Sequence, residues 1–358
     1  MTFNKIKKIY ILAPSKTYTG GPEALHQLAF TIKNKTKYKN VSMYYLPNST
    51  SNSVHSNFKK YNLPVAKKIE DSDDNLLVAG ELYEDIKFLQ NYKKINKAIW
   101  WLSFDNYLLS LFRNNNNKIT QKIIKIPFKI IKLFNFCTNY FYGDYIFFDF
   151  LKDIYLKNRF FNNLSFKNIN YHFTQSSYAK KILENNGHKT FNISDYLNND
   201  FFKNKYNKLT KENIITYNKT KSTNFMKLIL KKNTSIKFVP LVNLSKKEMI
   251  DILKKSKIYL DFGTHPGKDR IPREAAILGN CVLVNKKGSA KNKYDIAIPS
   301  EFKFTERYQD IKKINNKINK ILLNYDSEYK KFSSYVLKIK KEEKVFVKQV
   351  KSFFTSEI

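Results

Sequence analysis

Cysteine, arginine, glycine and proline are all scarce in this sequence of 358 residues. Its two cysteines, Cys137 and Cys281, lie far apart and have neither Cys-x-x-Cys nor Cys/His ligand spacing, which disfavours a disulfide framework and a structural zinc site. With 9 glycines and 9 prolines, the chain is neither collagen-like nor a flexible linker. So sparing a use of cysteine favours a reducing compartment.

Long apolar segments are also missing. No window of about 18 consecutive apolar residues occurs, so the sequence predicts no membrane-spanning helix. The N-terminal residues carry basic side chains around a short apolar run and have no small-residue cleavage site, which is not the pattern of a secretory signal. The expected location is therefore the cytoplasm.

Positive charge is abundant, and lysine supplies nearly all of it. The chain has 65 Lys+Arg against 30 Asp+Glu and a formal net charge of +35. The electrostatic field of so positive a protein attracts both anionic membranes and nucleic acid. The charge alone therefore does not show which of the two is the partner. Because lysine is so common, arginine is the more informative cation, and it occurs only at Arg113, Arg159, Arg270, Arg273 and Arg307.

Short apolar runs alternate with helix-length segments along both halves of the chain. Runs of this length, bounded by polar segments, are typical of buried strands. Strands joined by crossover helices form a parallel sheet covered on both faces, so two such sets predict an α/β chain with two Rossmann-like domains. The predicted strands are 10–13, 41–46, 76–79, 98–102 and 171–174 in the first set, and 214–217, 236–241, 258–262 and 281–284 in the second.

A polar stretch rich in Asn, Lys and Asp separates the two sets of strands near 192–211. We therefore predict an N-terminal domain over 1–195 and a C-terminal domain over 196–325. Beyond them, apolar residues recur at spacings of three, four and seven, which predicts one long amphipathic helix within 326–358.

A segment at about 108–165 does not fit a compact Rossmann-like domain and is predicted to be an insertion in the first one. Lysines spaced four and three residues apart would form one stripe along a helix, and a run dense in Phe and Tyr follows. This pattern suits a helix lying in a membrane interface, and equally a helical insertion packed on its own domain with its lysines in water. The lysines are Lys118, Lys122, Lys125, Lys129 and Lys132.

The most specific stretch is 258–290, where a predicted strand runs into a loop and then a helix that starts near Pro272. The loop therefore lies at the carboxyl edge of a parallel sheet, where ligands of doubly wound folds bind. Cations beside free N–H groups at a helix start form a phosphate site. A carboxylate in the first turn either accepts hydrogen bonds from sugar hydroxyls or pairs with a nearby arginine. The candidate phosphate-site residues are His265, Gly267, Lys268, Arg270 and Arg273, and the carboxylate is Glu274.

A second candidate turn follows the first predicted strand. Gly20 and Gly21 precede a helix there, and paired glycines permit the close approach of a ligand to a helix N-terminus. His26 on that helix is interpreted as structural.

Two further motifs are also interpreted as structural. Asp261-Phe262-Gly263 copies the metal triplet of protein kinases, but the other kinase loops are missing. Asp71-Ser72-Asp73 precedes an apolar strand, as a solvated acidic turn does. No GxGxxG, Walker, HExxH or GxSxG pattern occurs, which disfavours dehydrogenases, NTPases, metalloproteases and serine hydrolases, and no metal site is predicted.

Taken with these motifs, the layout resembles the GT-B glycosyltransferases of the glycogen-synthase-like, retaining kind, especially those of bacterial capsule and lipopolysaccharide pathways. The resemblance covers nearly the whole chain and is more specific in the second half, where PREAAILGNCVLV matches the family's carboxylate-bearing helix. It implies that Gly20 and Gly21 face a cleft between two domains. It also implies that Lys219 and Lys221 hold the donor diphosphate and that Glu274 binds the nucleotide ribose.

Two features of that family are replaced in this chain. Pro266 stands where the family has the first of two glutamates, and the surrounding loop HPGKDR takes its place. The N-domain histidine near the fourth strand is not evident, and Ser103 and Asp105 lie there instead. Asp105 and His265 are the candidate catalytic residues.

The sequence therefore predicts a glycosyltransferase that moves a sugar from a nucleotide-sugar donor to a cell-surface glycan or lipid-linked acceptor, with retention, without a metal and without another cofactor. The C-terminal domain would bind the donor and the N-terminal domain the acceptor, with the protein peripherally bound to the anionic inner membrane. One alternative is a GT-B sugar-nucleotide epimerase. Another is a non-enzymatic basic protein that binds membranes or nucleic acid, but RNA-recognition signatures are missing and no nucleic-acid partner is predicted.

Overall fold

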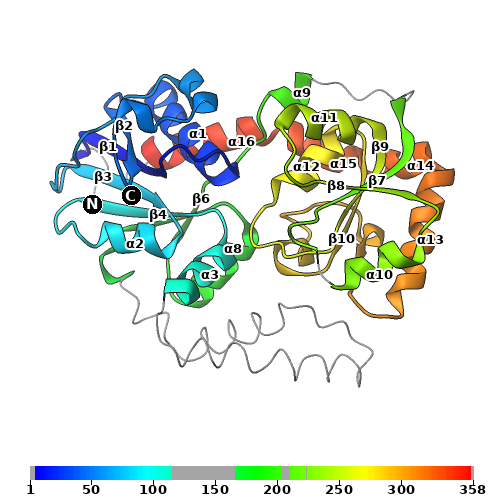
Figure 1. The fold of residues 1–358 in the computed structure, drawn as a ribbon. Helices are drawn as coiled ribbons and strands as arrows, with labels where there is room; N and C mark the ends of the chain where they lie inside the picture. Colours follow the sequence, from blue (N-terminus) through cyan, green and yellow to red (C-terminus); the bar gives the residue numbers. More distant parts are fainter. Residues whose placement is uncertain (1–4, 115–165, 204–209, 223, 356–358) are drawn as a thin grey trace. The chain divides into compact units, whose positions relative to one another are not determined.

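A computed structural model describes residues 5–114, 166–203, 210–222 and 224–355 (Figure 1). Most of the predicted insertion, including its lysine stripe and aromatic run, lies outside the described residues. The described chain divides into two compact units. The first comprises 5–114, 166–196 and 342–355, and the second comprises the described residues of 197–341.

The first unit is built on a six-stranded sheet in the order β2-β1-β3-β4-β5-β6, in which every paired strand is parallel. Every residue of β3 and β4 is buried, as expected for apolar runs covered on both faces. The prediction missed β6, which is only three residues long and partly exposed. The strands are β1 (Lys8–Pro14), β2 (Val41–Leu46), β3 (Asn75–Gly80), β4 (Asn96–Trp101), β5 (Tyr171–Thr174) and β6 (Thr190–Asn192).

The second unit has a five-stranded parallel sheet in the order β11-β10-β9-β7-β8. The prediction missed β11, a two-residue edge strand that is too short to leave a pattern. Two parallel sheets with crossover helices confirm the predicted fold class. The strands are β7 (Glu212–Tyr217), β8 (Lys237–Pro240), β9 (Ser256–Asp261), β10 (Cys281–Asn285) and β11 (Lys303–Phe304).

Helices cover both sheets (Figure 1). A capping box starts α11, in which Ser245 accepts a hydrogen bond from the backbone N–H of Glu248 and the Glu248 side chain accepts one from the Ser245 N–H. None of the described helices is both long and apolar enough to cross a bilayer. The first unit has α1 (Gly20–Lys35), α2 (Tyr83–Leu89), α3 (Phe104–Asn114), α8 (Ser177–Asn185) and α16 (Glu342–Thr355). The second has α9 (Asp200–Lys203), α10 (Asn224–Lys232), α11 (Lys246–Lys255), α12 (Arg270–Ile277), α13 (Asp310–Leu323), α14 (Tyr325–Lys330) and α15 (Ser333–Lys340).

The C-terminal segment differs from the prediction of one long helix, because it forms α14, α15 and α16. Phe332 and Ile339 belong to the core of the second unit. Phe346 and Phe353 belong to the core of the first, where α16 contacts α1. The apolar residues thus serve two separate cores, and the helix is interrupted at Lys341, where the chain passes from one unit to the other.

Each sheet has a point where the strand order reverses. In the first unit, the chain moves from β1 to β2 on one side and then to β3 on the other, so the reversal lies between β1 and β3. In the second unit, the same reversal lies between β7 and β9. Ligands of doubly wound folds bind outside the carboxyl ends of the strands at such points, so a ligand site is expected in the loops after these strands.

Candidate functional site

The loops after β7 and β9 meet at the carboxyl edge of the second sheet. A Cβ atom added at Gly263 would lie 2.6 Å from the Lys221 carbonyl oxygen, which is closer than real contacts allow. Glycine at this position therefore permits the β9–α12 loop to pack against the loop that carries Lys221.

Residues at and after the end of β10 form hydrogen bonds to the same β9–α12 loop. Asn285 Nδ2 donates to the Gly263 carbonyl at 2.7 Å, and the backbone N–H of Ser289 donates to the His265 carbonyl at 2.8 Å. Ser289 Oγ donates to the Gly267 carbonyl. Gly288 has a φ of +48°, and a Cβ there would overlap the His265 carbonyl. The backbone of the loop is thus fixed by specific contacts along its length.

Arg273, a predicted phosphate ligand, is fully buried in α12. Its Nε donates to the Asp269 carbonyl at 3.1 Å and its Nη2 to the Lys268 carbonyl at 2.9 Å. These bonds satisfy loop carbonyls and hold the loop against the helix. The structure therefore places Arg273 inside the unit as support for the loop.

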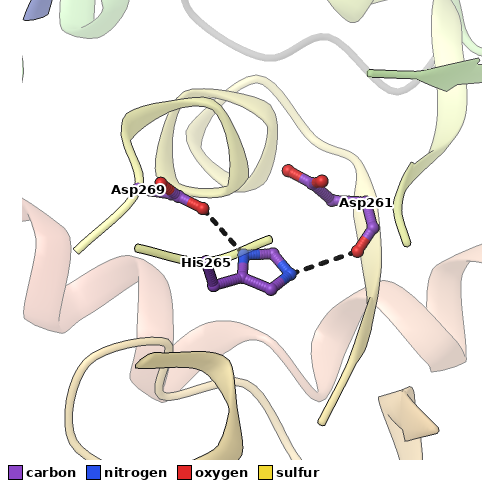
Figure 2. A group of neighbouring side chains, drawn as sticks. All are labelled: Asp261, His265 and Asp269. Carbon is purple, nitrogen blue, oxygen red and sulfur yellow. Dashed lines mark hydrogen bonds and ion pairs between the residues drawn. The ribbon is translucent and has the colours of Figure 1, made fainter. Parts of the chain in front are cut away.

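His265 lies at the centre of a buried group of charged side chains (Figure 2). Its Nδ1 is 2.7 Å from Asp269 Oδ2, and its Nε2 is 3.2 Å from the backbone carbonyl oxygen of Asp261. The other carboxylate oxygen of Asp269 lies 3.0 Å from Lys221 Nζ. Asp261 Oδ2 accepts a hydrogen bond from Tyr259 OH at 2.8 Å, whereas its buried Oδ1 has no hydrogen-bond partner among the described residues.

The protonation of this group follows from its surroundings. Burial opposes a charge on His265, but Asp261 and Asp269 outweigh it and raise the pKa of the imidazole. Burial would raise the pKa of Asp269, but Lys221 and His265 hold it below its ordinary value. Burial dominates at Asp261 and raises the pKa of that carboxyl. The group therefore balances two acids against two cations inside the protein.

The same side chains raise the question of a metal site, because the ligand-type atoms of Asp261, His265 and Asp269 all lie within 4.8 Å of one another. A metal needs a ring nitrogen with a free lone pair, and both nitrogens of His265 face oxygen acceptors. Both oxygens of Asp269 are engaged as well, and one of them is bound to the Lys221 ammonium. This donor set does not fit a metal ion, because Lys221 already supplies the positive charge.

The other residues predicted for this site differ in exposure. Lys219 is exposed and Arg270 is partly exposed, whereas Gly267, Lys268 and Glu274 are buried. Glu274 lies in α12 but beyond its first turn, because the helix begins at Arg270, before the start near Pro272 that the sequence predicted. The structure thus brings Lys221 and His265 into one group through Asp269, a residue that the sequence motifs did not single out.

In the first unit, Gly20 and Gly21 begin α1 directly after the β1 loop, as predicted. Thr19 at the N-cap makes no side-chain hydrogen bond to the helix. An added Cβ at Gly21 would meet only Leu102 Cδ1, at an ordinary 3.8 Å, so packing does not demand glycine there. Asp105 is buried and accepts a hydrogen bond from Tyr178 OH at 2.7 Å, which gives it a structural partner.

Glu81 is a buried acid that the sequence motifs did not reveal. It directly follows β3, beside the point where the first sheet reverses. Burial raises its pKa to about 8, and its Oε2 accepts a hydrogen bond from the Leu102 N–H at 3.2 Å. An acidic residue immediately after a strand whose centre, 76–79, is wholly apolar is the signal that could have identified it.

No protein-family model and no curated protein matches the chain. Solved structures do match. Alr3699/HepE of Anabaena, crystallised in complex with UDP, is 10% identical with a TM-score of 0.59, over 97% of this chain and 99% of that one. The lipopolysaccharide outer core galactosyltransferase WaaB is 10% identical with a TM-score of 0.58, over 98% of this chain and 99% of that one. The chain has the GT-B fold.

The trehalose-6-phosphate synthase OtsA extends this likeness, with 8% identity and a TM-score of 0.52 over 96% of this chain and 99% of that one. At identities this low, the likeness shows the GT-B fold and does not show which reaction is catalysed. The GT-B fold nevertheless confirms the fold that the sequence motifs predicted.

Proposed function

We propose that this chain is a nucleotide-sugar-dependent glycosyltransferase whose second unit binds the donor. The observation that carries the proposal is the Lys221–Asp269–His265 group at the strand-order reversal of the second sheet. It holds the partly exposed Lys221 ammonium at the place where doubly wound folds bind nucleotides. Alr3699/HepE was crystallised with UDP, which makes UDP the first donor nucleotide to test here.

The diphosphate would be held by cations that line the two neighbouring loops. Lys219 and Arg270 are at least partly exposed, and Lys221 is held beside them by Asp269. The ribose hydroxyls would be bound by Glu274, with Gly267 and Lys268 in the loop that precedes it. In this assignment Arg273 supports the loop and does not touch the phosphates.

The reaction would depend on stabilising the negative charge of the leaving group. As the sugar leaves, the departing nucleoside diphosphate gains negative charge, and cations placed in advance stabilise that charge without a metal. Retention at the anomeric carbon is part of the proposal and is supported by the motif resemblance.

The acceptor would be a cell-surface glycan or a lipid-linked sugar bound by the first unit. WaaB, which shares the fold, is a lipopolysaccharide outer core galactosyltransferase. Of the candidate residues in this unit, Gly20 and Gly21 at the start of α1 would contribute to donor binding, and Asp105 in α3 is a candidate catalytic residue. Peripheral binding to the anionic inner membrane completes the proposal and rests on the sequence of 118–136.

The test begins with the purified full chain and calorimetry with UDP and with uridine. Glu274→Gln should weaken both ligands by roughly ten- to a hundredfold, because both contain the ribose and a charged hydrogen bond is lost. Folding should stay intact by circular dichroism. Unchanged affinity for both ligands would remove Glu274 from the site.

Nucleotide sugars should then be supplied with an extract of lipid-linked acceptors, and the products followed by mass spectrometry. Release of free UDP together with a glycosylated acceptor is the expected result. Conversion of the nucleotide sugar into an isomer without an acceptor would instead show an epimerase, and wild-type protein that binds no nucleotide would overturn the proposal.

A further inference from the structure

The hydrogen bonds of His265 determine how many protons its ring carries. Nδ1 faces a carboxylate oxygen of Asp269 and Nε2 faces the backbone carbonyl of Asp261. Both of those oxygens act as acceptors, and Asp269 is held as a carboxylate by the Lys221 ammonium at 3.0 Å. Each ring nitrogen must therefore donate a hydrogen, and the ring is an imidazolium.

The Asp269 side chain binds Lys221 and His265 and does not cap α12. It occupies the N-cap position of α12, where an aspartate side chain ordinarily accepts a hydrogen bond from the first turn of the helix. Its side chain makes no such bond. One carboxylate oxygen is bound by Lys221 and the other by His265, so the two cations compete for a single negative charge.

Resting on the proposed function of this site, we propose that His265 is a positioning residue for the donor diphosphate. As a buried imidazolium it shares Asp269 with Lys221, so the Lys221 ammonium keeps enough positive charge to bind the diphosphate. Without the imidazolium, the whole charge of Asp269 would fall on Lys221. His265 thus acts through Lys221 and does not touch the ligand.

The surrounding charges support this division of roles. Four ionisable groups face the ring or its partners: Asp261 and Tyr259 from β9, Asp269 at the start of α12 and Lys221 from the β7 loop. Removing the imidazolium would leave Lys221 alone to neutralise Asp269. Losing the charge-assisted hydrogen bond from Lys221 to the diphosphate would weaken the affinity for UDP by roughly ten- to thirtyfold.

The protonation state can be measured without any donor. In the full chain labelled with ¹⁵N-histidine, both ring nitrogens of His265 should carry protons at pH 7, with the signal assigned by its loss in His265→Gln. A neutral tautomer at that pH would overturn the proposal.

The positioning role can be measured by calorimetry with UDP and with uridine. His265→Gln should weaken UDP by roughly ten- to thirtyfold and leave uridine unchanged, because only UDP carries the charge. In a Lys221→Met background the same substitution should weaken UDP by less than about threefold, since the residue through which it acts is gone. Losses that simply add in the double variant would overturn the proposal.

Two controls complete the experiment. His172 is also a buried histidine, but it is neutral, since burial lowers its pKa to about 3, and its Nδ1 accepts a hydrogen bond from Trp101 Nε1 at 3.0 Å. His172→Gln should leave the affinity for UDP unchanged. In addition, wild-type affinity for UDP should fall as the pH rises through the raised pKa of His265, and His265→Gln should lack this fall.

If His265→Gln fails to fold, the His265 signal can be assigned by replacing the other four of the 5 histidines in turn, and the fall of wild-type affinity for UDP with rising pH still tests the role. Wild-type protein that binds neither UDP nor any other nucleoside diphosphate at any pH would overturn the proposed function and, with it, a role for His265 toward a donor. Wild-type protein that binds UDP normally but shows additive losses would overturn the present inference alone.

Discussion

Arg273 and Lys221, two basic residues of the proposed donor site, lie in different surroundings. Both are predicted phosphate ligands by sequence. Arg273 is fully buried and donates to the Lys268 and Asp269 carbonyls, whereas Lys221 is partly exposed and shares a carboxylate. A rigid guanidinium with several donors suits the first use, and a flexible ammonium suits the second.

Arg273→Ala should therefore act on stability. It removes donors from two loop carbonyls and leaves a cavity, so the free energy of unfolding should fall by about 2–4 kcal/mol in urea denaturation. Arg307→Ala, at an exposed position, is the matched control. It should change the free energy of unfolding by no more than about 0.5 kcal/mol. Intact stability together with selective loss of UDP over uridine would restore Arg273 as a diphosphate ligand.

Glu81 makes the stability of the chain depend on pH. Burial raises the pKa of this carboxyl from 4.5 to about 8. Between these values the folded chain holds a proton that the unfolded chain has lost, so Glu81 favours folding at low pH and this contribution disappears as the pH rises toward 8.

Glu81→Gln, which keeps the side chain neutral, should accordingly stabilise the protein by about 2–4 kcal/mol at pH 8.5 relative to wild type and have a much smaller effect at pH 4.5. Urea unfolding at the two pH values measures the difference. Exposed Glu343, changed to Gln, should show no such dependence. An equal effect of Glu81→Gln at both pH values would show that the native carboxyl is not protonated.

At the scale of secondary structure, the second unit depends on how its helices end. Lys211 Nζ donates to the carbonyls of Leu253 at 3.0 Å, Ser256 at 2.7 Å and Leu278 at 2.8 Å. Leu253 lies in the last turn of α11, and Ser256 and Leu278 are the C-cap residues of α11 and α12. One side chain therefore donates to carbonyls at the ends of two helices, and Asn280 Nδ2 also donates to the Leu253 carbonyl, at 2.8 Å.

Lys211→Met keeps the aliphatic stem and removes the donors. It should lower the free energy of unfolding by about 1–3 kcal/mol, because the buried Ser256 and Leu278 carbonyls lose this donor, whereas the Leu253 carbonyl keeps Asn280 Nδ2. Exposed Lys255, at the end of α11, is the matched control and should change little when it is replaced by Met. Unfolding followed by circular dichroism compares the two, and equal stabilities would show that the carbonyls find other partners.

At the scale of the whole molecule, membrane association remains a prediction from sequence, since 118–136 lies outside the described residues. Each lysine of the stripe should contribute about 1 kcal/mol on an anionic surface, screened by salt, and the apolar residues should add a part that salt does not remove. Binding to anionic vesicles in a sedimentation assay should therefore fall with added salt and persist in part.

Ile130→Asp combined with Ile131→Asp should abolish the salt-resistant part of that binding. Ile214→Asp, in the buried β7 strand, serves as the control for unfolding and should lower stability instead. If the double variant unfolds and the wild type does not bind vesicles, residues 118–136 pack in the protein core and do not bind the membrane.

Much of this chain can be predicted from its sequence alone. Buried parallel strands require apolar runs, and crossovers require helix-length spacers, so the order of apolar and polar segments predicts the two sheets and the loop at 264–270. Local patterns also predict a helix after Gly20 and Gly21 and one starting near Pro272, and the structure begins these helices at Gly20 and Arg270. Strands, loops and helix starts depend on residues that are close in the sequence, so composition and spacing are enough to predict them.

Tertiary structure alone decided the roles of the charged residues. The proton on His265 depends on the Asp261 carbonyl and on Asp269, and the charge of Asp269 depends on Lys221 from another strand end. The break of the C-terminal segment into α14, α15 and α16 arises in the same way, because its apolar residues pack in two different cores. Burial and ion pairing are set by groups distant in sequence, and no local pattern encodes them.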